Sequence, residues 1–141
     1  MTLAVRDILT RGPVIPVVTI DDAAAGPDLA RALLDGGISV IEVTMRTAAA
    51  LDAVRAIRNA VPEMLAGVGT LLDPDRIDAV LASGAQFAVS PGLDLSLVEA
   101  CRVAGLPLLP GIQTVSEAMA ARRAGLDTLK FFPARSAGGP G

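Results

Sequence analysis

Histidine, tyrosine and tryptophan are absent from this sequence of 141 residues, and cysteine occurs once, as Cys101. Without histidine, the chain can build neither a Ser-His-Asp triad nor a histidine metal site. A single cysteine supports neither a disulfide framework nor a thiolate zinc site. Because Cys101 has helical spacing with Leu97, Val98 and Ala104, we expect a small core residue rather than a catalytic thiol.

Positive charge is also scarce, with 12 Lys and Arg residues against 15 Asp and Glu and a net charge of −3. Surfaces that bind nucleic acid or anionic membranes need clustered basic residues, and nucleic-acid binding also uses aromatic platforms. No apolar run approaches the length of a membrane span, and Arg6 and Asp7 interrupt the segment that a signal peptide would need. We therefore expect a cytoplasmic protein that binds neither nucleic acid nor membranes.

Lysine occurs only once, at Lys130, although the chain contains eleven arginines. An amine can lose its proton near neutral pH and attack a carbonyl carbon, whereas a guanidinium does not. Lys130 is therefore a candidate Schiff-base nucleophile. The alternative is a solvated lysine at the end of a strand in an arginine-rich composition.

Apolar runs bounded by glycine and proline recur every 20 to 25 residues, and the segments between them have helical periodicity. The runs predict six strands, at residues 14–20, 39–45, 64–71, 86–90, 106–112 and 128–132. Helix starts are indicated at Asp21 or Asp22, at Thr47, at Asp73 before a proline, and at Thr114, which begins a capping box. Strands alternating with helices indicate a single α/β domain over residues 1–141 with a parallel sheet.

Two architectures fit this alternation, a (β/α)8 barrel and an open doubly wound sheet. The dinucleotide fingerprint is missing, because Gly67-Val68-Gly69 is not followed by a third glycine, and no Walker-type phosphate loop is present. Polar residues gather at the carboxyl ends of several predicted strands, where barrel enzymes build their sites. This pattern favours the barrel.

Side chains alternate along a strand, so the predicted strand at residues 39–45 has two faces. The face expected to point into the barrel carries Val40, Glu42, Thr44 and Arg46, and the other carries Ile41, Val43 and Met45. The same alternation turns Thr128, Lys130 and Phe132 inward. Glu42 and Lys130 can then meet across the interior. The alternative is a buried structural ion pair for Glu42, a solvated loop residue at Arg46 and a turn cap at Thr70.

Five ordered motifs together resemble one family, the class I 2-keto-3-deoxy-6-phosphogluconate (KDPG) and 4-hydroxy-2-oxoglutarate (KHG) aldolases. The motifs are Glu42-Val43-Thr44-Met45-Arg46-Thr47, Gly67-Val68-Gly69-Thr70, Ser90-Pro91-Gly92, Pro110-Gly111-Ile112 and Lys130-Phe131-Phe132-Pro133-Ala134. The resemblance covers the whole chain, and Gly12-Pro13-Val14-Ile15-Pro16-Val17 also fits the first strand of that family.

The resemblance implies a (β/α)8 TIM-type barrel that assembles as a homotrimer. It further implies cleavage of KDPG to pyruvate and glyceraldehyde 3-phosphate, and of 4-hydroxy-2-oxoglutarate to pyruvate and glyoxylate, without metal or cofactor. The residue roles that it implies are a Schiff base on Lys130, proton transfer by Glu42, carboxylate binding by Arg46 and Thr70, and pocket walls from Pro91 and Phe132.

The chain departs from the family at Gly138-Gly139-Pro140-Gly141, where it ends after the sixth strand. Family members continue for two further strand-helix units, which close the barrel and carry the phosphate-binding loops. We therefore expect six of eight units, exposed first and sixth strands, and partial solvent exposure of Val40, Val68 and Phe132. Two hypotheses follow: a truncated or partial form of the aldolase, or a non-catalytic fragment that pairs its open edges with another chain.

Overall fold

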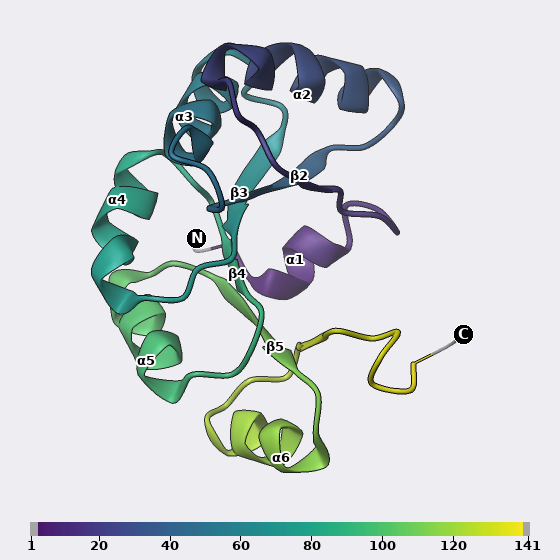
Figure 1. Ribbon diagram of the computed structural model, residues 1–141, viewed down its shortest axis with the longest axis vertical. Coiled ribbons are helices and arrows are strands. Elements are labelled where there is room, and N and C mark those ends of the chain that lie inside the picture. Colours follow the sequence, from purple (N-terminus) through teal and green to yellow (C-terminus); the bar gives the residue numbers. More distant parts are fainter. Residues whose placement is uncertain (1–2, 140–141) are drawn as a thin grey trace.

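The computed structural model describes residues 3–139, in which six strands alternate with helices (Figure 1). Each strand lies inside one of the six apolar runs that predict it. The strands are β1 (Val17–Val18), β2 (Val40–Thr44), β3 (Leu65–Gly69), β4 (Ala88–Ser90), β5 (Leu108–Ile112) and β6 (Lys130–Phe131). The single-domain prediction includes residues 1, 2, 140 and 141, which lie outside the described part of the chain.

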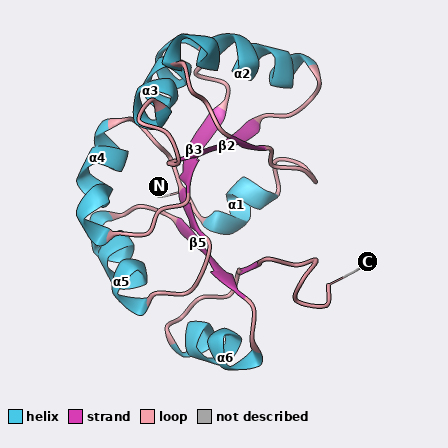
Figure 2. Cartoon of the chain, in the orientation of Figure 1, coloured by secondary structure: helices cyan, strands magenta, loops and turns pink. Residues whose placement is uncertain are grey.

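All six strands are parallel and follow one another in sequence order across the sheet. The sheet curls so that its concave side faces α1 (Val5–Leu9), while the remaining helices cover its convex side (Figures 1 and 2). Sequential parallel order with helices outside is the arrangement of a (β/α) barrel rather than of an open doubly wound sheet. Within residues 3–139, β1 and β6 each pair on one side only.

The outer layer consists of five helices and two short 3-10 turns, η1 and η2. These elements are η1 (Ala23–Ala25), α2 (Gly26–Asp35), α3 (Ala50–Ala60), η2 (Pro74–Arg76), α4 (Ile77–Ala82), α5 (Leu95–Ala104) and α6 (Val115–Arg123). Side chains of Asp22, Asp73 and Thr114 accept backbone hydrogen bonds as N-caps, and Thr114 forms the predicted capping box with Glu117.

Thr47 does not begin a helix, contrary to the sequence-based expectation. Its hydroxyl donates a 2.6 Å hydrogen bond to the Ile20 carbonyl, and α3 begins three residues later, at Ala50. The threonine therefore ties the loop after β2 to the loop after β1. The N-cap of α3 is instead Ala49, which makes no side-chain cap hydrogen bond.

Helix α1 was not expected from the sequence, and it covers the concave face of the sheet (Figure 1). Ile8 is 2% exposed and packs with Val40, Leu65, Phe87 and Val89. Because this helix shields the interior, the prediction that Val40 becomes solvent exposed is wrong; its side chain is 2% exposed. The prediction for Val68 is also wrong, because Val68 belongs to the cluster on the helix side of the sheet.

Strand alternation divides the core into two apolar clusters, as predicted for β2. Ile41 and Val43 pack under the outer helices, whereas Val40 joins the inner cluster. Cys101 lies on α5 in the outer cluster and is 1% exposed. Burial raises the pKa of its thiol to about 11, so the thiolate needed for nucleophilic attack is disfavoured at neutral pH.

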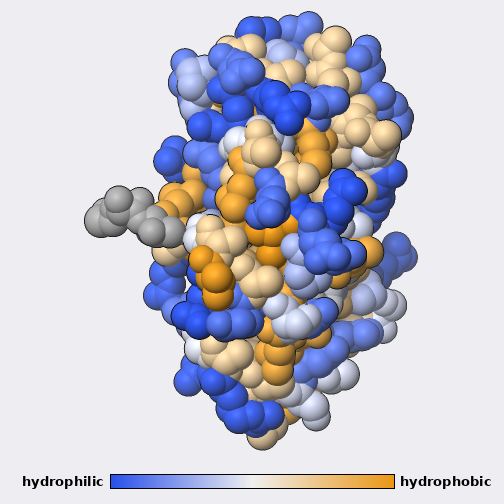
Figure 3. All heavy atoms as spheres, turned by 90° about the vertical axis from the view of Figure 1, so that its left-hand side faces the viewer, coloured by the Kyte–Doolittle hydropathy of each residue, from blue (hydrophilic) through white to orange (hydrophobic). Residues whose placement is uncertain are grey.

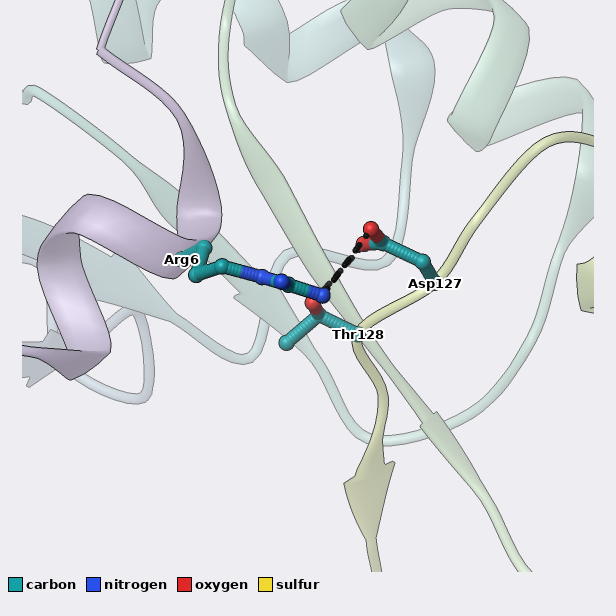
Figure 4. A network of polar contacts seen from close by, with 3 residues as sticks. All are labelled: Arg6, Asp127 and Thr128. Carbon is teal, nitrogen blue, oxygen red and sulfur yellow. Dashed lines mark hydrogen bonds and ion pairs between the residues drawn. The ribbon is translucent and has the colours of Figure 1, made fainter.

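One ion pair joins α1 to the segment before β6, although these parts are far apart in the sequence (Figure 4). Arg6 Nη2 donates to Asp127 Oδ2 at 3.2 Å, and the Thr128 hydroxyl donates to Asp127 Oδ1 at 2.8 Å. Both charged side chains are about 70% exposed, so the pair contributes little to stability.

The face of the molecule that carries α4 and α5 mixes hydrophilic residues with smaller apolar areas (Figure 3). Exposed apolar side chains of these two helices include Leu81 on α4 and Val103 on α5. Within residues 3–139, no helix combines the length and the apolar character needed to cross a membrane.

Candidate active site

Glu42 is a carboxylate held almost entirely inside the half barrel. It lies in the middle of β2, faces the concave side and is 5% exposed. Burial raises the pKa of Glu42 above its ordinary value, and the positive charges of Lys130 and Arg46 partly oppose that rise. A buried carboxylate with a raised pKa can exchange a proton closer to neutral pH than an exposed glutamate can.

Lys130 lies opposite, as the first residue of β6, and pairs in register with Gly111 of β5. Lys130 and Glu42 line the same cavity of about 190 Å³, whose other walls come mainly from α1, β1 and β4. The strand alternation therefore correctly predicts that the two side chains face the same interior space. Lys130 Nζ lies 4.7 Å from the centroid of the Phe132 ring, within the range of a cation-π interaction.

Arg46 does not lie on the inner face of a strand, where the sequence analysis predicts it. Strand β2 ends at Thr44, and Arg46 lies exposed in the turn that follows. Its guanidinium nevertheless partly opposes the rise in the pKa of Glu42, so its positive charge acts on the Glu42 carboxylate. An exposed cation at this end of the sheet can meet an anionic group of a ligand that enters from solvent.

Thr70 follows β3 directly and adopts a left-handed backbone conformation with φ of 60°. A threonine in this region is strained, because its branched side chain crowds the backbone. The alternative role of Thr70 as a cap is not supported, since Asp73 caps the next turn by accepting from Asp75 N at 2.9 Å. The strained residue sits at the carboxyl end of the sheet, where barrel proteins bind ligands.

Pro91 follows β4 and is half buried at the same end of the sheet. Its turn is fixed by the Ser90 hydroxyl, which donates to the Gly92 carbonyl at 2.8 Å. The Pro91 carbonyl lies against Gly111, whose register partner is Lys130. The structure thus places Glu42 and Lys130 on one cavity and Phe132 beside Lys130. Arg46, Thr70 and Pro91 follow the carboxyl ends of β2, β3 and β4 and do not line that cavity.

Three glycines at this site were not predicted as site residues. A Cβ atom added to Gly69 would collide with the Glu42 side chain, one on Gly67 would meet the Phe87 ring at 2.5 Å, and one on Gly111 would collide with Pro91. The available signal was the glycine at every second residue of β3, on the inner face beside Glu42.

Among residues 3–139, no three His, Cys, Asp or Glu side chains are grouped to hold a metal ion.

The fold and this site define a (β/α)-barrel protein with a lysine and a buried carboxylate facing each other in its interior. A family model described as KDPG and KHG aldolase matches residues 5–140, and the chain belongs to that family. It is 48% identical to the KHG/KDPG aldolase of Escherichia coli K12 over 134 residues, which cover 95% of this chain and 63% of the relative. The chain thus spans about 63% of the length of that curated relative.

Two solved structures have the same fold over the matched region. One is a KDPG aldolase from Legionella pneumophila with pyruvate captured as a covalent carbinolamine intermediate; it is 42% identical, with a TM-score of 0.90 over 94% of this chain and 65% of that one. The other is the KDPG aldolase of Zymomonas mobilis ZM4 with 3-phosphoglycerate, 40% identical, with a TM-score of 0.89 over 96% and 66%. These neighbours confirm the barrel-type fold, of which this chain supplies six strands.

Proposed function

We propose that this chain carries the Schiff-base chemistry of a class I aldolase, a lyase that cleaves KDPG to pyruvate and glyceraldehyde 3-phosphate. The observation that carries the proposal is the buried Glu42 facing Lys130, the only lysine, across one cavity. Support also comes from the pyruvate carbinolamine captured in the Legionella relative. Cleavage of 4-hydroxy-2-oxoglutarate to pyruvate and glyoxylate is proposed as a second activity of the same site, because the Escherichia coli relative is named for both substrates.

In the proposed reaction, Lys130 Nζ attacks the C2 carbonyl of the 2-keto acid and forms a carbinolamine. Loss of water gives a protonated imine. The Glu42 carboxylate then removes the proton of the C4 hydroxyl, the C3–C4 bond breaks to release the aldehyde, and its electron pair moves into the imine as an enamine. Protonation at C3 and hydrolysis by water release pyruvate and restore Lys130.

Binding of the keto acid is assigned to the exposed cation and to the strained threonine at the strand ends. Arg46 carries the positive charge that the substrate carboxylate needs, and Thr70 supplies a hydroxyl donor at the end of the neighbouring strand. Pro91 and Phe132 form pocket walls in this proposal. Phe132, at 4.7 Å from Lys130 Nζ, also offers a ring face to the cationic imine.

Reductive trapping tests the proposal directly. Incubation with pyruvate and borohydride should convert the imine to a stable secondary amine on Lys130, identified by peptide mass spectrometry. The matched control is Lys130→Arg, which keeps the charge and leaves the N-terminal amine as the sole remaining primary amine. Label confined to the N-terminal amine in the wild-type chain would refute the Schiff-base assignment and favour a non-catalytic chain that pairs its edge strands with another protein.

Assembly as a homotrimer and a cytoplasmic location are further expectations from the family resemblance. Sedimentation equilibrium of the chain tests the first, because a trimer has three times the mass of the 14.3 kDa chain. Cell fractionation with a tagged chain tests the second.

A further inference from the structure

Strand β3 carries two glycines on its inner face, Gly67 and Gly69, and the proposed reaction uses neither. Glu42 of β2 is the register partner of Gly67, and Thr44, two residues later on the same face, is the register partner of Gly69. The Glu42 side chain extends along this face and lies over Gly69. A Cβ atom added to Gly69 would lie 2.7 Å from Glu42 Cδ and 2.8 Å from Cγ, and would collide with Oε1.

Such distances lie far inside van der Waals contact, so an alanine at this position requires something to move. The backbone of β3 is fixed from both sides. Met45 N donates to the Gly69 carbonyl at 2.8 Å, and on the other side Leu71 N donates to the Val89 carbonyl at 3.1 Å. Displacing β3 would break ladder hydrogen bonds with β2 or β4, whereas rotating the glutamate breaks none of them. The Glu42 side chain is therefore the part that yields.

The direction of that movement is set by the surrounding packing. Phe87 occupies the space over Gly67, where an added Cβ would lie 2.5 Å from three ring atoms. Phe87 belongs to the inner apolar cluster and is 2% exposed, so it closes the route toward the amino end of the strands. The cavity that Glu42 shares with Lys130 offers space away from β3, and we expect the carboxylate to move into it.

We propose that Gly69 is a positioning residue for the proton-transfer step: its missing side chain provides the space in which the Glu42 carboxylate is held beside Lys130. The inference rests on the proposed function for its kinetic part. Its structural part, that Gly69 fixes the location of Glu42, stands independently of activity. Misplacement of a catalytic group by about 1 Å reduces rate by up to about 100-fold, so a single methyl group at this position is sufficient to matter.

The test uses Gly69→Ala, with Gly12→Ala as its matched control. Gly12 has no atom within 4 Å of an added Cβ, so the control adds the same methyl group without a contact. In Gly69→Ala we expect pyruvate to be trapped on Lys130 about as readily as in the wild type. We expect exchange of the pyruvate methyl protons with deuterated water, which needs the proton-transfer group, to fall about 10- to 100-fold. Unchanged exchange in a folded Gly69→Ala protein would overturn the inference.

Two measurements do not depend on activity. The chain has four glutamates, so 13C-carboxyl glutamate labelling gives four resonances, and loss of one in Glu42→Gln assigns Glu42. In Gly69→Ala the pKa of Glu42 should move down toward the ordinary glutamate value, because the displaced carboxylate moves toward Lys130, whose positive charge lowers this pKa. An unaltered Glu42 titration would contradict the positioning role even if the wild-type chain traps no pyruvate.

A second variant covers the case in which Gly69→Ala folds poorly. All three atoms nearest to the added Cβ belong to Glu42 beyond its own Cβ, so Glu42→Ala removes every one of them. Gly69→Ala should therefore lower the urea midpoint in the wild-type background and leave it nearly unchanged in the Glu42→Ala background. An equal decrease of the urea midpoint in both backgrounds would show that the strand itself requires a glycine at this position, independently of the Glu42 side chain. Absent trapping in the wild type, with this coupling intact, would reject the proposed function and keep the packing inference.

Discussion

Lys130 Nζ lies 4.7 Å from the centroid of the Phe132 ring, so the only lysine of the chain has an aromatic face beside it. A ring face attracts a cation, and it attracts a protonated imine in the same way as an ammonium. Phe132 is 38% exposed, which limits the interaction to the weaker end of its range. If the proposed imine forms on Lys130, we therefore expect the ring to adjust its stability rather than to determine whether it can form.

Replacing Phe132 with leucine should weaken pyruvate imine formation about 2- to 5-fold, the equivalent of about 0.5–1 kcal/mol. The measurement is the pyruvate concentration that gives half-maximal borohydride trapping. Phe131→Leu is the matched control, because Phe131 is similarly exposed at 42% and is the neighbouring aromatic residue. Equal effects of the two substitutions would mean that the contact with Nζ contributes nothing.

Replacing Glu42 with glutamine should leave imine trapping on Lys130 largely intact and slow the exchange of pyruvate methyl protons by about 100-fold or more. The amide keeps the shape of the side chain in its buried site but cannot accept the proton. Proton exchange is followed by NMR in deuterated water. Exchange at the wild-type rate would assign Glu42 to a structural ion pair with Lys130 instead of to proton transfer.

The stability of the protein should also report the raised pKa of Glu42. Burial raises this pKa above 4.5, with the charges of Lys130 and Arg46 opposing the rise. For such a group the contribution to folding is fully present below pH 4.5, where both states are protonated, and is lost as pH rises through the folded-state pKa. The stability of Glu42→Gln relative to wild type should therefore increase from pH 4.5 toward neutrality.

Urea unfolding of both proteins across that pH range provides the measurement. Glu63→Gln is a suitable control, because it removes one carboxylate from an exposed position outside the cavity. A difference between wild type and Glu42→Gln that is constant with pH would contradict the predicted linkage.

The strands were predictable from sequence because glycine and proline bound each apolar run, and the caps at Asp22, Asp73 and Thr114 were predictable because their side chains act locally. Helix α1 was not, since five residues are too few to establish a helical period and its N-cap, Ala4, is not a typical capping residue. The start of the helix is instead stabilised by Asp7, whose carboxylate accepts a hydrogen bond from the Ala4 amide at 3.1 Å.

The location of Glu42 and Lys130 on one interior cavity was predictable, because strand alternation and parallel order fix which side chains face inward. The position of Arg46 was not, because alternation holds only while the strand continues, and β2 ends two residues earlier. The role of Gly69 also escaped sequence reasoning. A steric requirement for glycine depends on the rotamer of the side chain that lies over it, here Glu42, and rotamers cannot be read from spacing.

The Arg6–Asp127 ion pair should be nearly neutral for stability despite joining distant segments (Figure 4). Asp127→Asn should lower the free energy of unfolding by less than about 1 kcal/mol, and the loss should shrink at high salt because both groups are exposed. Urea unfolding at low and high ionic strength measures this. A large, salt-independent loss would indicate that the segment before β6 depends on this contact for its position.

Gly111 should be intolerant of a side chain, because an added Cβ would collide with the Pro91 carbonyl oxygen and would lie 3.0 Å from Gly92 N. Unlike Gly69, whose neighbour is a side chain that can rotate, Gly111 faces the backbone of the turn after β4. The Ser90 hydroxyl fixes that turn by its 2.8 Å hydrogen bond to the Gly92 carbonyl.

Gly111→Ala should therefore destabilise the protein by about 1–3 kcal/mol, the usual cost of overpacking a fixed backbone. It should also weaken pyruvate trapping, since Gly111 is the register partner of Lys130 and a shifted β5 carries β6 with it. Gly92→Ala is the matched control in the same turn, because an added Cβ there has no atom within 4 Å. If the two variants unfold at the same urea concentration, the close approach of the turn after β4 to β5 is not what holds Lys130 in place.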